Sequence, residues 1–94
     1  MAGGTAEAVL ALLKADLGVT HTKRDEYFAV LIAAAAKMLR TEGIILDLSD
    51  QADQLLLEMY AAHLHERRQQ PTMAMPRYLR AKINNRLCHQ QMQG

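Results

Sequence analysis

The sequence predicts an all-α fold, a small single domain built as a bundle of about four helices. Half of the 94 residues are hydrophobic, with no Trp, one Phe and three Tyr, so Ala, Leu, Ile and Met supply most of the apolar weight, as is typical of helices. Apolar residues recur every three to four positions in four stretches. The expected helices cover residues 6–17, 23–42, 49–68 and 76–90, and the expected flexible tails are residues 1–5 and 91–94.

The third of these helices, 49–68, is expected to hold the central position. Its apolar surface is broader than one stripe, so it should contact more than one neighbour. Ser49 is predicted to be its N-cap. Acidic side chains in its first turn and basic side chains in its last turn suit the helix dipole. Asp53 and Glu58 are placed on its polar side.

Local signals mark the ends of the other helices. Thr5 is predicted to cap the first helix, and Thr22 with Asp25 forms a Thr-x-x-Asp capping box that opens the second. Gly18 and Gly43 follow these two helices, where a left-handed residue commonly ends a helix. The last helix is expected to begin at Pro76, after a loop.

The middle of the second helix, residues 27–36, is apolar on every side. Such a helix is expected to be buried on every side, and so small a monomer can hardly cover it, so part of this surface is expected to meet another subunit. Three side chains are assigned to the internal core and three to a neighbouring subunit: Phe28, Leu31 and Ala35 to the core, and Val30, Ala33 and Ala34 to the neighbour. The alternative is a helix sandwiched between the first and third helices of its own chain.

Charge is divided unevenly along the chain. Residues 1–60 carry five Lys or Arg against nine Asp or Glu, a formal charge of about −4, whereas residues 61–94 carry six against one, about +5. Such a dipolar subunit can stack on copies of itself or offer a basic surface to DNA. Ordinary solvated helix faces are the alternative explanation.

The sequence offers no recognisable catalytic, cofactor or metal site. His63 and His65 are two residues apart, which on a helix points them about 200° apart, so they cannot share a metal. No glycine-rich phosphate loop or nucleophile elbow is present. The four histidines are assigned surface or packing roles, and Cys88 is expected to be a small buried hydrophobe. We therefore expect no enzyme, no cofactor and no metal.

A soluble protein of a reducing compartment is expected. The longest apolar run, 28–36, is far shorter than the roughly 20 residues that cross a bilayer. The first residues lack the basic region of a secretory signal. A single cysteine cannot form an internal disulfide.

Several stretches, taken in order, resemble the head–tail connector (adaptor, or head-completion) proteins of tailed bacteriophages. The family's opening Leu-Lys-x-x-Leu-x-Val segment is similar to residues 13–19, and the acidic pair that opens its long helix is similar to Asp25 and Glu26. Its Leu-Ile-x-x-Ala core resembles residues 31–35. Its Ala-His-aromatic-aromatic-Glu-x-Arg helix end is similar to residues 62–68, where Leu64 and His65 stand in place of the two aromatics. The Met-Pro opening of its final helix resembles residues 75–83.

This resemblance implies a structural virion protein and no enzymatic activity. Family members form a ring, usually twelvefold, that binds the portal protein on one side and a tail or stopper protein on the other, and DNA passes through the ring without sequence specificity. The implied location is the head–tail interface of the virion, after assembly in the cytoplasm of the host bacterium. Four basic residues are expected to face the portal or the channel: Arg67, Arg68, Arg77 and Arg80.

Two other functions stay open at this stage. A small helical DNA-binding regulator could use the basic C-terminal helix as its reader, with Arg77, Arg80, Asn84 and Arg86 on one face. Arg86, however, is nine positions from Arg77 and therefore half a turn out of register. A helical partner-binding module of host origin is the third possibility. Duplex binding with a steep salt dependence would favour the regulator.

Overall fold

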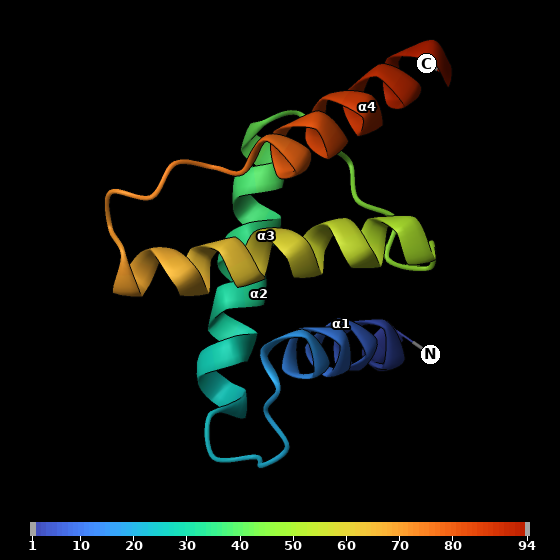
Figure 1. Ribbon diagram of the computed structural model, residues 1–94. Helices are drawn as coiled ribbons and strands as arrows, with labels where there is room; N and C mark the ends of the chain where they lie inside the picture. The colour runs from blue at the N-terminus through green and yellow to red at the C-terminus, as the bar shows by residue number, and fades with distance from the viewer. Residues whose placement is uncertain (1, 94) are drawn as a thin grey trace.

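The structure is a computed structural model that describes the backbone of residues 2–93 and the side chains of residues 7–92. Within this range the chain forms four helices and no strand, which confirms the all-α prediction (Figure 1). The helices are α1 (Ala2–Leu17), α2 (Asp25–Thr41), α3 (Gln51–Gln69) and α4 (Arg77–Gln93).

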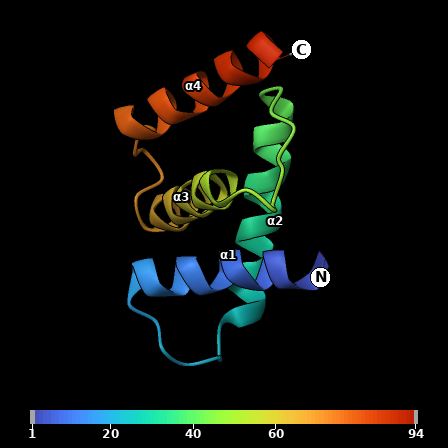
Figure 2. The same ribbon diagram turned by 90° about the vertical axis from the view of Figure 1, so that its right-hand side faces the viewer.

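Helix α3 lies between α1 and α4, and α2 runs across them (Figures 1 and 2). Helix α3 contacts all three other helices, so its predicted central position is confirmed. The molecule measures 41 × 38 × 18 Å. One helix with its side chains is about 10 Å across, so the shortest dimension, 18 Å, holds no more than about two layers of helices. Most helices therefore have one face in water.

One hydrophobic core joins the four helices. Phe28, Leu31 and Ala35 of α2 are buried in it, as predicted. The other buried apolar residues come from every helix and from the α2–α3 linker: Val9, Leu13, Leu39, Ile44, Leu56, Leu57, Tyr60, Ala61, Ala62, Leu79 and Ile83. Helix α4 contributes two fully buried side chains, as many as α1 does within residues 7–17. Its main helix contact is with α3 alone, whereas α1 packs against both α2 and α3.

The outer ends of the first and last helices extend further than predicted. Helix α1 begins at Ala2 and not at residue 6, so Thr5 lies within the helix, and α4 continues to Gln93. The expected tails are therefore helical over residues 2–5 and 91–93. Met1 and Gly94, which the prediction also assigned to the tails, lie outside the described residues.

Two predicted N-caps are wrong by a short distance. Helix α3 begins at Gln51, and its cap is Asp50, whose carboxylate accepts a hydrogen bond from the Ala52 N–H at 2.8 Å. Ser49 instead donates its hydroxyl to Asp47. Helix α2 begins at Asp25, after an Arg24 that makes no side-chain cap. The capping box is thus absent, although its acidic residue does lie in the first turn.

The glycines end their helices as predicted. Gly43 has φ +100°, a value that residues with a Cβ rarely adopt. Its N–H bonds to the carbonyl of Arg40 at 2.9 Å, and the next N–H, of Ile44, bonds to that of Leu39 at 3.0 Å. This pair of bonds is a Schellman motif. Gly18 ends α1 in the same way, so the two turns come directly from local sequence.

Glu58 is buried, although the sequence placed it on the polar side of α3. Only 4% of its surface is exposed. Burial and the nearby carboxylate of Asp16 in α1 raise its pKa from 4.5 to about 8. At neutral pH the side chain is therefore a neutral acid within the α1–α3 contact.

This carboxyl group should make the stability of the fold fall as the pH rises. Its folded pKa lies above its unfolded pKa, so the folded state holds the proton more tightly, and stability is lost between about pH 4.5 and 8. Glu58→Gln, which cannot ionise, should lack this part of the pH dependence. Urea unfolding of both proteins at pH 5, 7 and 9 should show that the free energy of unfolding of the variant rises relative to that of the wild type as the pH increases. If the two free energies change with pH in parallel, Glu58 does not have the raised pKa assigned to it.

Candidate assembly surface

The outer face of α2, formed by Val30, Ala33 and Ala34, is the surface that the sequence assigned to a contact between subunits. Val30, Ala33 and Ala34 lie on one side of the helix, because positions three and four apart share a face. All three are exposed, Val30 by 65%. The alternative of a helix sandwiched within its own chain does not hold, since α2 buries one side only.

An apolar groove of about 360 Å³ lies beside this face, between α1 and α2. Ala29, Ala33 and Ala36 form its α2 wall, and Leu10 lies on its α1 wall. The remaining lining residues come from α1, α2, the α2–α3 linker and α3: Glu7, Val9, Ile32, Leu48 and Leu57. Small side chains along one wall let another backbone approach closely, and the lining is apolar apart from Glu7.

The four basic residues expected at the portal or the channel lie in two separate places. Arg68, at the end of α3, lies with its guanidinium 4.9 Å from the ring centre of Tyr27, in the first turn of α2. Arg80 of α4 forms an ion pair of 2.9 Å with Glu42, which follows the last turn of α2. Tyr27 and Glu42 are about 22 Å apart along the helix, at 1.5 Å per residue.

The other two arginines of the set, Arg67 and Arg77, each lie close to one of the two just described. Arg67 is exposed beside Arg68, and Arg77 is exposed beside Arg80. The chain thus carries two small basic regions at opposite ends of α2 and no continuous basic face of these four residues.

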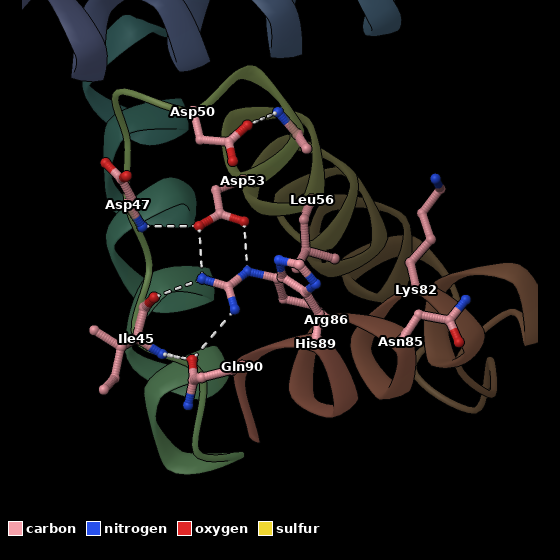
Figure 3. Close-up of a pocket in the computed structure, with 11 residues that line it drawn as sticks. Ile45, Asp47, Asp50, Asp53, Leu56, Lys82, Asn85, Arg86, His89 and Gln90 are labelled. Carbon is pink, nitrogen blue, oxygen red and sulfur yellow. Dashed lines mark hydrogen bonds and ion pairs between the residues drawn. The ribbon is translucent and has the colours of Figure 1, made fainter. Parts of the chain in front are cut away.

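A second cavity, of about 650 Å³, lies between α4, the start of α3 and the α2–α3 linker (Figure 3). Arg86 crosses it from α4. Its Nε and Nη2 donate to the two carboxylate oxygens of Asp53 at 2.7 and 3.0 Å, and Nη2 also donates to the Ile45 carbonyl at 2.8 Å. Gln90 joins the same network through the Ile45 N–H at 2.9 Å and the Gly43 carbonyl at 2.9 Å. We call this network the α4 clamp.

Asp53 is the buried centre of the α4 clamp, although the sequence placed it on the polar side of α3. It is 2% exposed. Burial alone would raise its pKa, but the hydrogen bonds from Arg86 and from the backbone N–H of Asp47 outweigh burial and hold the pKa below its usual value. The carboxylate is therefore ionised and fully engaged. Its role is to fasten α4 to α3 and to the α2–α3 linker.

The clamp also removes one residue from the alternative DNA-reading face. Arg86 points inward to Asp53, whereas Lys82 and Asn85 point away from it (Figure 3). Arg80 is paired with Glu42. A reader helix would have to break both pairs to present these side chains to DNA.

His63 and His65 have packing roles, and Cys88 lies on the surface. His65 hydrogen-bonds the Tyr27 hydroxyl at 2.9 Å. His63 is buried, and burial lowers its pKa. Cys88 is exposed, so its expected burial is wrong. Among the described residues, no three His, Cys, Asp or Glu side chains lie close enough together to hold a metal ion.

No family model, curated protein or solved structure matches this chain. None of the helices within residues 2–93 is long and apolar enough to cross a membrane.

Sequence reasoning missed two features of these surfaces. The residues that line the groove come from α1, α2, α3 and the linker. No single stretch of sequence therefore predicts it. The α4 clamp joins Asp53 to Arg86, 33 residues later. The one available signal was an acidic residue at an apolar-periodic position of α3, opposite a helix rich in arginine.

Proposed function

We propose that this protein is a head–tail connector subunit of a tailed bacteriophage, a structural protein that forms a ring beneath the portal. The exposed apolar face of α2, with Val30, Ala33 and Ala34 beside the α1–α2 groove, is the observation that carries the proposal. A single chain leaves this surface in water, and exposed apolar surface of this kind favours association.

The resemblance in sequence supplies the biological setting. It assigns the ring to the head–tail interface, between the portal protein and a tail or stopper protein. The two basic regions, at Arg67 and Arg68 and at Arg77 and Arg80, are suited to contact different neighbours or the DNA in the channel. Because the ring acts by joining other components, no catalytic group is required.

The direct test is the mass of the purified protein, measured by light scattering over a concentration series. Negative-stain images of the same fractions show whether larger species are closed rings. We expect rings, or a mass that climbs with concentration toward one closed size. If the protein stays monomeric or dimeric alone, it should still assemble when mixed with the portal protein from the same source. Failure in both experiments would contradict the proposal, and tight, salt-sensitive duplex binding would point to the regulator.

A further inference from the structure

The outward face of α4 carries a regular row of side chains. Helix α4 packs inward through Leu79 and Ile83, which are fully buried. The row on the opposite side advances alternately by three and four residues, and all its members are exposed: Tyr78, Ala81, Asn85, Cys88 and Met92. This is the spacing of a seam between two packed helices. We call it the α4 seam.

The α4 seam has the composition of a contact surface and not of a solvated face. Tyr78 is 61% exposed and Met92 is 81% exposed. Ala81 and Cys88 are small enough to let a partner helix approach. Asn85, at the centre, resembles the single polar residue that fixes the register of a helical pair at some cost in stability.

Pairing of two α4 helices with each other is disfavoured by charge. Helix α4 contains four basic residues and no acidic one. In a parallel pair, Arg77 of one copy would flank Lys82 of the other, which is a like-charge contact. An antiparallel pair would bring no carboxylate to either residue. The surface that complements the seam must therefore carry acidic groups.

The α1–α2 groove meets this requirement. Glu7 lines it, and Glu26 is exposed on α2 one turn before Ala29 and Val30. The other end of α2 carries exposed Lys37 and Arg40. A helix that lies parallel to α2 would set its basic first turns against the glutamates, and the partial negative charge of its C-terminus would approach the two cations.

We propose that the α4 seam of one copy fills the α1–α2 groove of the next copy, with α4 parallel to α2. The inference rests on the proposed ring and names the two surfaces that build it. Helices α4 and α1 lie on opposite sides of α3 (Figures 1 and 2), so the seam and the groove are different surfaces of one copy. A contact between two different surfaces is heterologous, and repetition of such a contact closes a ring when the rotation allows it.

Cys88 makes the contact testable by cross-linking. If Arg77 lies beside Glu26, the parallel alignment places Cys88, eleven residues further on, beside position 37 and hence next to Ala36. A disulfide requires Cα atoms roughly 4.4–6.8 Å apart. Ala36→Cys should therefore yield a ladder of covalent oligomers on a non-reducing gel after mild oxidation. Ala29→Cys, at the other end of the groove, should yield little.

Two control variants keep this experiment specific. Ala36→Cys combined with Cys88→Ser should give no ladder, and Gln69→Cys, on the exposed end of α3, should give none with the native Cys88. A ladder from Ala29→Cys alone would overturn the parallel alignment. Rings without any ladder would overturn the seam-and-groove contact and leave the proposed function standing, whereas the absence of rings, alone and with the portal, would remove both.

A charge exchange tests the same contact without a new cysteine. Arg77→Glu should raise the concentration needed for half-assembly about tenfold, since it places a glutamate against Glu26 of the next copy. Glu26→Arg combined with it should restore assembly toward the wild-type concentration. Equal losses from the single and the double variant would contradict the pairing.

Discussion

Replacing Arg86 by Ala should destabilise the fold by about 3–4 kcal/mol, the cost of leaving a buried charge without its partner. Asp53 is 2% exposed and receives two hydrogen bonds from this guanidinium. Without Arg86, the carboxylate keeps one backbone bond, from Asp47, and faces the cavity without its cation. Urea unfolding followed by circular dichroism measures the loss. A domain of this size has a total stability of only about 5–15 kcal/mol, so the loss is a large fraction of the total.

Arg80→Ala is the matched control on the same helix. Arg80 also pairs with a carboxylate, that of Glu42, but their side chains are 44% and 30% exposed. Water replaces such a partner, so the expected loss is below about 1 kcal/mol. Equal losses from the two substitutions would show that burial of Asp53 does not decide the energetics of the clamp.

Ala33→Glu should abolish ring assembly while leaving the helical signal and the urea midpoint close to those of the wild type. Ala33 is exposed on α2 and also lines the α1–α2 groove. A charge at an apolar contact loses its hydration when the contact forms. The free chain is little affected, because glutamate is a good helix former.

Ala33→Ser separates the effect of charge from that of any change at this site. Serine is nearly as small as alanine and should still allow rings, which light scattering and negative-stain images can show. Ala34→Glu, on the same face, should behave as Ala33→Glu does. A ring formed by either glutamate variant would remove the outer face of α2 from the assembly contact.

The parts of the fold that the sequence predicted depend on local interactions. The spacing of apolar residues placed four helices, and Gly18 and Gly43 marked two helix ends because their positive φ favours glycine. The N-cap of α3 was missed by one residue, since Ser49 and Asp50 are both good capping residues and only the backbone decides between them. The core assignments in α2 held because that helix has one strongly apolar side.

The errors concern polar residues whose burial depends on distant partners. Asp53 and Glu58 were assigned to the polar side of α3 because they are charged, yet the ion pair with Arg86 and the α1–α3 contact allow them to be buried. No rule of spacing connects residues 33 positions apart. The exposure of Val30, Ala33 and Ala34 could be foreseen, because one helix carries more apolar surface than a small chain can cover. Their contact with a neighbouring subunit stays a prediction.

The clamp has a further consequence for the linker between α2 and α3. Side chains of α4, and not other backbone groups, satisfy the carbonyls of Gly43 and Ile45 and the N–H of Ile45. Whenever α4 lifts away, these three backbone groups lose their partners together. Lifting of α4 and loosening of the linker should therefore form a single cooperative opening event.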